Sequence, residues 1–250
     1  MKLRKEYQDQ VKTFTEVCHR LAKQMYVTGY GGNLAWKVED DLLLITPTQT
    51  NKGDVKKKDV VFVDLEGNVV EGRRRPTGEL PMYLKFFNER QDVVSVIHCH
   101  PPHCGAVAIS TAKNWLMRPL YPETTTEIGP VPVVPYAQPL TEELAQKFSP
   151  YLQRYNSFVM ENHGLVTMSR GDIEWTMMNV ELLESTAQSI FLAFAVGGIK
   201  ELSLEDVQRL GEVMWQRNLP LFGAPGVNES LESLYFDGEG KPLWTAPASE

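Results

Sequence analysis

Apolar positions between residues 3 and 26 recur at spacings of three and four, the period of one face of an α-helix. The residues on this face are Val11, Phe14, Val17, Cys18, Leu21 and Met25. Helical patterns continue further along the chain, at 82–90, 106–110, from 141 onward, 172–195 and 204–215. In the longest of these helices the candidate core contacts are Trp175, Met178, Leu182, Ile190 and Phe194.

Short runs of β-branched and apolar residues between the helices predict strands. They lie at 34–38, 42–45, 60–64, 68–71, 92–97, 131–136 and 157–160. Acidic residues at 39–41 and the Glu66-Gly67 pair separate the first four runs into two hairpins. No internal repeat or interdomain linker interrupts this mixture of helices and strands.

The last 35 residues are rich in Pro and Gly but keep large apolar side chains, which is not the composition of a disordered tail. These side chains are Phe222, Leu234, Tyr235, Phe236 and Trp244. A chain of 250 residues can bury one sizeable core. We therefore expect one domain over 1–250, with 215–250 as a C-terminal extension packed on this subunit or a neighbour.

Two histidines close the apolar run at 92–97, and a third follows the run at 157–160. Strand alternation places His98 and His100 on the same face. His163 brings another imidazole to a second strand end. Three such imidazoles can hold one divalent ion and leave a position open for water or substrate, as catalytic metal sites do.

A structural zinc site is the alternative reading of these histidines, although such sites are usually closed by four ligands and are often rich in Cys. Cys99 lies between the histidines in sequence, but alternation points it to the opposite face and into the core. His103 follows two prolines, so we expect it in a loop or beside the ligands rather than among them.

Three further features are open to two interpretations each. The glycines of 28–33 could expose backbone N–H groups to an anion, or simply form a turn between helix and strand. Glu79 could favour a helix N-terminus through its charge or act as a catalytic carboxylate. The three arginines at 73–75 favour a solvated loop flank over a binding site.

A net charge of −7 without a basic stripe argues against a nucleic-acid partner. No run approaches eighteen apolar residues, so we expect no membrane span. Three cysteines show no extracellular framework, and the charged N-terminal helix lacks the pattern of a signal peptide. We therefore expect a cytoplasmic protein.

Taken together, these residues resemble the class II aldolase/adducin family, which includes fuculose- and rhamnulose-phosphate aldolases and ribulose-phosphate 4-epimerase. The resemblance covers roughly residues 5–200 and keeps the family's order and spacing. Its markers are Gly31-Gly32-Asn33-Leu34, Ile45-Thr46-Pro47-Thr48, Glu79, His98-Cys99-His100 and Asn162-His163-Gly164.

The resemblance implies an α/β fold, a three-layer α/β/α sandwich around a mostly antiparallel sheet. It also implies a homotetramer with active sites at subunit interfaces. It assigns the metal-ligand roles to His98, His100 and His163, and the acid/base role to Glu79. Tyr121, fifteen residues before Tyr136, takes the place of an active-site tyrosine that a neighbouring subunit often supplies.

The remaining candidates bind the substrate by resemblance, through Asn33, Thr48, Gln49, Thr77 and Gly78. Two of them depart from relatives that use phosphate esters. Gln49 replaces a glycine that lets phosphate approach the backbone, and Gly78 replaces a serine hydroxyl. These departures predict that an unphosphorylated donor is used.

We therefore expect a metal-dependent aldolase that forms a metal-stabilised enolate of a small keto acid such as pyruvate, or of a hydroxy-ketone. Zinc suits three histidines best, with manganese, cobalt, nickel and magnesium as alternatives, one ion per chain. The alternatives in function are a sugar-phosphate aldolase, an epimerase, a dehydratase or a decarboxylase of the same family. A non-catalytic adducin-like scaffold is disfavoured because it needs neither the ion nor Glu79.

Overall fold

The computed structural model describes residues 2–111 and 114–245. They form one sheet in the strand order β4-β3-β2-β1-β5-β8-β7-β6. The strands are β1 (Asn33–Glu39), β2 (Leu42–Ile45), β3 (Val61–Val63), β4 (Val69–Glu71), β5 (Ser95–Cys99), β6 (Val133–Val134), β7 (Ser157–Met160) and β8 (Gly164–Ser169). Neighbouring strands pair antiparallel except β6 and β7, which pair in parallel.

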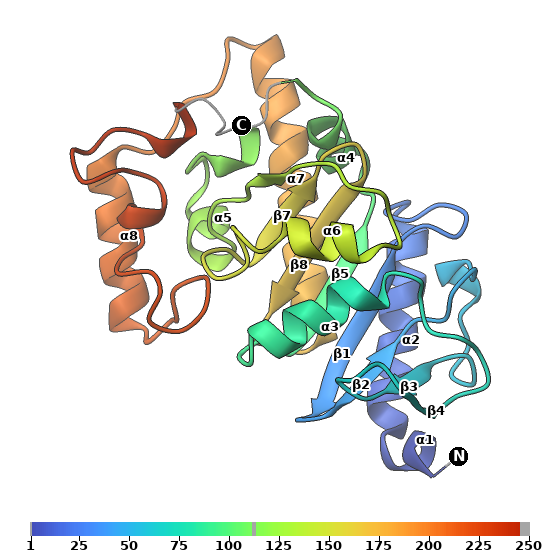
Figure 1. Cartoon of the computed structure of the whole chain (residues 1–250). Helices are drawn as coiled ribbons and strands as arrows, with labels where there is room; N and C mark the ends of the chain where they lie inside the picture. Colours follow the sequence, from blue (N-terminus) through green and yellow to red (C-terminus); the bar gives the residue numbers. More distant parts are fainter. Residues whose placement is uncertain (1, 112–113, 246–250) are drawn as a thin grey trace.

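Helices cover both faces of the sheet, which confirms the predicted three-layer sandwich (Figure 1). α2, α4 and α7 pack on one face, and α3 and α6 pack on the other. The helices are α1 (Leu3–Glu6), α2 (Gln8–Lys23), α3 (Leu80–Glu89), α4 (Pro102–Ala108), α5 (Pro122–Glu127), α6 (Glu142–Lys147), α7 (Ile173–Ala195) and α8 (Leu204–Gln216). Short 3-10 turns are η1 (Lys52–Asp54), η2 (Trp115–Met117), η3 (Glu232–Leu234) and η4 (Leu243–Thr245).

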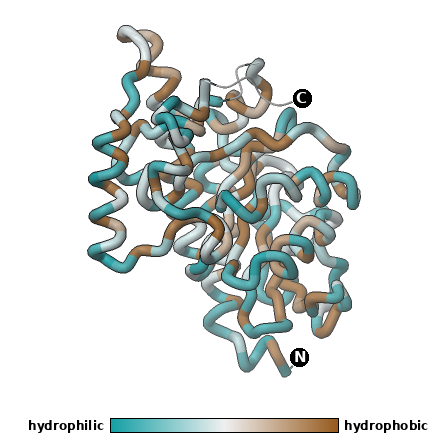
Figure 2. Tube along the Cα trace, turned by 60° about the vertical axis from the view of Figure 1, so that its left-hand side comes forward, coloured by the Kyte–Doolittle hydropathy of each residue, from teal (hydrophilic) through white to brown (hydrophobic). Residues whose placement is uncertain are grey.

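Strand β5 lies in the middle of the sheet and is buried on both faces. Ile97 and Cys99 face the layer of α2 and α7, whereas Val96 faces α3. This alternation follows from the period of two along a strand. The prediction that Cys99 packs in the core is confirmed. In Figure 2 hydrophobic stretches run mainly through the interior of the trace, and hydrophilic residues gather at the outer turns.

Several predicted boundaries were wrong. The helix at 3–26 is broken at Tyr7, whose hydroxyl donates to Glu39, and it ends at Lys23, so that Met25 is exposed. The strand at 131–136 shrinks to β6, because prolines 132 and 135 have no N–H to donate. The strand at 92–97 begins only at Ser95.

Two other corrections concern helices. α5 was not predicted, because its three threonines carry no apolar period and little helix propensity. In α7 the stripe that faces the sheet is shifted from the predicted one and includes Met177, Val180, Leu183, Ala187 and Ile190. Of the predicted contacts Ile190 is buried and Leu182 is partly buried, but Trp175, Met178 and Phe194 are 47%, 47% and 50% exposed.

The segment after α7 builds its own hydrophobic cluster beside the sheet, at the left of Figure 1. Its buried members are Val207, Met214, Phe222, Leu231, Leu234, Tyr235, Phe236 and Trp244. Met117 and Tyr155 of the main body pack against this cluster. No helix in residues 2–111 or 114–245 is long and apolar enough to cross a membrane.

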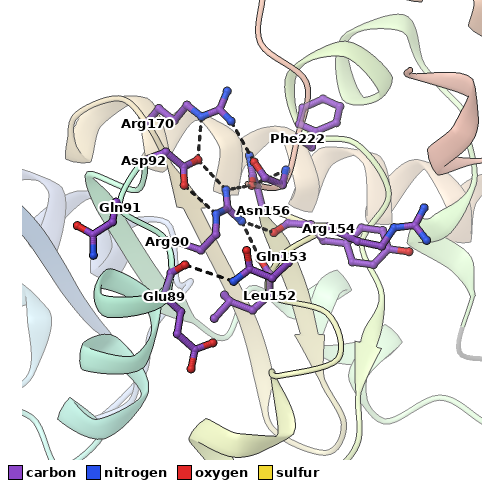
Figure 3. A network of polar contacts seen from close by, with 12 residues as sticks. Glu89, Arg90, Gln91, Asp92, Leu152, Gln153, Arg154, Asn156, Arg170 and Phe222 are labelled. Carbon is purple, nitrogen blue, oxygen red and sulfur yellow. Dashed lines mark hydrogen bonds and ion pairs between the residues drawn. The ribbon is translucent and has the colours of Figure 1, made fainter. Parts of the chain in front are cut away.

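A polar network anchors this segment to the sheet (Figure 3). Arg90 is fully buried; its Nε and Nη2 donate to the Asp92 carboxylate at 2.8 and 2.9 Å, and Nη2 also donates to Asn156. Arg170 donates to Asp92 and, at 3.0 Å, to the carbonyl of Gly223. The N–H of Gly223 donates to the Asn156 Oδ1 at 3.1 Å.

Candidate active site

The three predicted metal ligands meet at one end of the sheet. His98 lies near the end of β5, His100 follows that strand, and His163 occupies the turn between β7 and β8. The ring centre of His98 is 4.7 Å from each of the other two. One nitrogen from each ring lies within 4.8 Å of the others. The structure thus brings together the residues that strand alternation and strand ends predicted.

Two glycines make room for the His100 ring. A Cβ on Gly164 would lie 2.4 Å from the ring's Cδ2, and a Cβ on Gly31 would lie 2.8 Å from its Nδ1. Any side chain at these positions would therefore displace the imidazole. Part of the glycine-rich loop at 28–33 serves this close approach.

The protonation of the cluster suits a divalent ion. His98 Nδ1 is 3.0 Å from the Leu165 carbonyl, so it carries the proton that donates there and leaves Nε2 free. Burial, followed by the nearby His100, lowers the pKa of His98 to about 3. Burial and His98 lower the pKa of His163 to about 4, and burial also lowers the pKa of His100. All three rings are therefore neutral at neutral pH, as metal ligation requires.

Glu79 stands beside this cluster at the N-cap of α3 and is only 4% exposed. Its Oε1 lies 3.4 Å from His163 Nε2 and its Oε2 lies 3.6 Å from His98 Nε2. Asn33 Nδ2 donates to Oε2 at 2.8 Å, and Tyr83 donates to Asn33 Oδ1 at 2.6 Å. This chain of hydrogen bonds fixes the carboxylate next to the imidazoles.

A cavity of about 220 Å³ opens onto the histidines and Glu79. It is lined by all five predicted substrate residues, Asn33, Thr48, Gln49, Thr77 and Gly78. The amide of Asn33 is bound to Glu79, and the Thr77 hydroxyl accepts from the Glu79 N–H at 3.3 Å. A cavity of this size suits a small molecule of a few carbon atoms.

The two departures from phosphate-using relatives have distinct structural settings. Gln49 has a φ of 50°, in the left-handed region that glycine favours, so a bulky amide stands on a glycine-like backbone. At Gly78 a Cβ would lie 2.9 Å from Leu140 Cδ2. A serine at position 78 would therefore require the end of the Leu140 side chain, which also lines the cavity, to shift.

Sequence reasoning missed Lys52, Tyr83 and Leu140. Lys52 sits in a polar loop, where a lysine normally faces solvent, yet it is 2% exposed and lines the cavity. Tyr83 had a usable signal, because it lies four residues after Glu79 at the start of a helix and so shares its face. Leu140 adopts a φ of 66° in a loop, and no local pattern indicates its position.

Tyr121 is not brought to the histidines within one chain. Its side chain is 44% exposed and lines a separate depression with Ser189 and Lys200. The supply of this tyrosine by a neighbouring subunit stays a prediction. His103 lies in the first turn of α4 and not in a loop, and its Nδ1 lies 2.8 Å from Glu184, outside the cluster.

Arg74 of the arginine run is held away from the histidines. It donates to the Thr50 hydroxyl at 2.9 Å and lies 3.3 Å from Asp59. Arg73, Arg74 and Arg75 do not line the histidine cavity. Their interpretation as a loop flank agrees with this placement.

The sheet, the histidine cluster and the neighbouring carboxylate together define an α/β/α sandwich with a site at which three histidines could hold a metal ion beside an acidic group. The family model of the class II aldolase and adducin N-terminal domain matches residues 12–191. The chain belongs to this family, as the sequence markers predicted.

The chain is similar to an L-fuculose phosphate aldolase of Methanococcus maripaludis, with 32% identity over 75% of this chain and 98% of that protein. A 3-oxo-tetronate 4-phosphate decarboxylase of Pectobacterium atrosepticum is 28% identical over 74% of this chain and 84% of its own. Among solved structures, YgbL from Klebsiella pneumoniae, a candidate aldolase, epimerase or decarboxylase, superposes with a TM-score of 0.75. It is 28% identical and covers 81% of this chain and 98% of its own.

Proposed function

We propose that this protein is a divalent-metal-dependent aldolase that makes and breaks the carbon–carbon bond beside the carbonyl group of a small donor. One observation carries the proposal: three neutral imidazoles converge next to a buried carboxylate at the floor of a small cavity. The aldolases named among the relatives support the reaction class.

His98, His100 and His163 would hold one ion per chain, with zinc as the first choice and manganese, cobalt, nickel or magnesium as alternatives. Such an ion supplies Lewis-acid polarisation of the donor carbonyl. Three neutral ligands leave its full charge available for this purpose. In residues 2–111 and 114–245 no cysteine joins the cluster, which argues against a closed structural zinc site.

Glu79 moves the proton on carbon. In the addition direction it removes a proton from the donor carbon next to the carbonyl, and the resulting enolate attacks the aldehyde carbon. In the cleavage direction Tyr121 accepts the proton of the adduct's hydroxyl group, the carbon–carbon bond breaks and the aldehyde leaves, and Glu79 returns a proton to the donor carbon. Asn33 and Tyr83 keep the carboxylate aimed at that position.

Tyr121 would protonate the aldehyde oxygen during addition, acting from a neighbouring subunit of a tetramer. Its exposure and its absence from the lining of its own chain's histidine cavity support this arrangement. The exposed apolar side chains of α7, including Trp175 and Met178, offer surface for subunit contacts.

For the donor we propose a small unphosphorylated compound, an α-keto acid such as pyruvate or a hydroxy-ketone. Gln49 fills space at a glycine-like backbone, and Gly78 lacks a hydroxyl and lies under Leu140. The second candidate is a phosphorylated sugar substrate, cleaved, epimerised or decarboxylated at the same site. The relatives favour this second candidate, because the names of all three kinds refer to phosphate esters.

A donor panel tests both parts of the proposal. The metal-loaded protein is given pyruvate, hydroxypyruvate, dihydroxyacetone or dihydroxyacetone phosphate, each with one common aldehyde, and the adduct is followed by NMR. We expect at least one unphosphorylated donor to match or exceed the phosphate ester in kcat/KM. An advantage of about a hundredfold or more for the ester, roughly 2.7 kcal/mol, would reject the donor assignment. A lack of adduct with every donor would reject the aldolase.

A further inference from the structure

Lys52 is a buried cation at the wall of the histidine cavity. Its Nζ donates to the Thr50 carbonyl at 2.7 Å and to the Tyr30 carbonyl at 3.1 Å. No acidic side chain in the described part of the chain forms an ion pair with it. Two of its three N–H bonds are therefore used on neutral acceptors, and the ammonium group makes no direct ion pair in the described residues.

A buried charge without a partner is costly, so buried lysines are normally paired. Burial lowers the pKa of Lys52, and the charge of Glu79 opposes this effect only in part. Glu79 forms no ion pair with Lys52, because its carboxylate accepts from Asn33 and lies against the imidazoles. A bound anion would supply the missing direct partner.

The two carbonyls that hold Lys52 belong to the two loops that flank the cavity. Tyr30 lies in the loop before β1, and Thr50 lies in the loop after β2, next to Gln49. Lys52 ties these loops together and lines the cavity. An anion bound there would take the third N–H and neutralise the charge.

We propose that Lys52 binds the anionic group of the donor and thereby favours anionic donors over neutral ones. The anion is a carboxylate if the donor is a keto acid, and a phosphate if it is a phosphate ester. This assignment rests on the proposed function for its place in the reaction. It makes Lys52 the specificity residue for donor charge, while Glu79 acts on the carbon.

The alternative is that Lys52 only holds the two loops together. Replacement by Met keeps the length of the side chain and removes its charge, and replacement by Arg keeps the charge. Lys58→Met is the matched control, because Lys58 lies six residues away and is exposed outside the cavity. Unchanged far-UV circular dichroism and metal content verify that each variant folds.

Direct binding is measured first, by calorimetric titration of the metal-free protein with pyruvate and with inorganic phosphate at low salt. We expect Lys52→Met to weaken binding of at least one anion about tenfold or more, and Lys52→Arg to retain most of it. Lys58→Met should bind like the wild type. Absence of binding to the wild type, or equal binding to wild type and Lys52→Met, would overturn the proposal.

Turnover then identifies the source of the anion. Loss confined to pyruvate in Lys52→Met identifies a carboxylate, and loss confined to dihydroxyacetone phosphate identifies a phosphate; KM should rise about tenfold or more with little change in kcat. Dihydroxyacetone, which is neutral, should be unaffected. An equal loss for neutral and anionic donors would leave only the loop-holding role and reject the proposal. Anion binding that depends on Lys52 without any turnover would reject the aldolase but keep this assignment.

Discussion

At the scale of single residues, the cavity combines two kinds of titratable side chain with different tasks. Burial keeps the imidazoles neutral and therefore ready for a metal, and the Asn33 amide holds the Glu79 side chain within 3.4 to 3.6 Å of two of them. Substitution of a histidine should therefore remove the metal, whereas substitution of Glu79 should remove proton transfer and leave the metal bound.

We expect the purified protein to hold about one divalent ion per chain, and His98→Ala or His163→Ala to lose it, because two remaining ligands bind a divalent ion weakly. Elemental analysis after dialysis measures this. His19→Ala is the matched control, since His19 contacts the Val55 carbonyl outside the cluster. Full metal content in both ligand variants would show that the ion binds at other residues.

Glu79→Gln should keep the metal but lose proton exchange at the donor carbon, because the amide has nearly the same shape and is not a base. We expect deuterium exchange into the donor, followed by NMR, to slow by about 10² to 10⁴. Glu89→Gln, at the far end of the same helix, should exchange like the wild type. Exchange at the wild-type rate in Glu79→Gln would identify a different base.

At the scale of elements, strand β5 joins two charged sites. His98 stands near its carboxyl end, whereas Arg90 and Asp92 precede its amino end. The Asp92 carboxylate is the counter-ion of a fully buried guanidinium. Its removal should therefore affect stability rather than metal chemistry.

Asp92→Asn should destabilise the fold by about 3 to 5 kcal/mol, since it leaves Arg90 buried without a countercharge. Urea denaturation followed by circular dichroism measures the loss. Asp40→Asn, in the exposed turn between β1 and β2, should change the stability by less than about 0.5 kcal/mol. Equal midpoints for the two variants would contradict the role of the buried pair.

The same carboxylate should make stability depend on pH. Burial opposes ionisation of Asp92, but hydrogen bonds and charge from Arg90 and Arg170 outweigh it and hold its pKa below the ordinary 3.8. A lowered pKa stabilises the fold above the unfolded value of about 3.9, and this contribution is lost as pH falls below it. Urea midpoints should therefore drop between about pH 5 and pH 3 more steeply in the wild type than in Asp92→Asn.

The parts of the fold that the sequence predicted correctly are those with a regular local spacing of apolar residues. The hairpins, α3 and α8 were found because their apolar spacing is regular, and the histidines because strands end beside them. Lys52 and Asp92 could not be assigned in this way, because their burial and their contacts with Tyr30 and Arg170 depend on long-range packing. Tyr121 shows the same limit at a longer range, since its predicted partner lies in another subunit.

At the scale of the whole molecule, the prediction of interfacial active sites can be tested by mixing two inactive proteins. Tyr121→Phe and His98→Ala should each be inactive alone. If the tyrosine acts across an interface, co-expression of the two should restore about a quarter of the sites, those that combine an intact cluster with an intact tyrosine. Light scattering should give the mass of four chains. If a proven mixed oligomer recovers no activity, Tyr121 either acts within its own chain or has no role in catalysis.

The anchor at Gly223 lies at the end of β5 and β8 opposite to the histidines, as the pairing of Ser95 with Ser169 and of Cys99 with Leu165 shows. The methanococcal relative is matched over 98% of its length by only 75% of this chain. A carboxyl-terminal segment fastened so far from the reacting atoms can be lengthened, replaced or fused to another module over evolutionary time while the chemistry stays under separate selection. In comparisons across the family, substitution rates beyond residue 215 should therefore vary independently of those around the cavity.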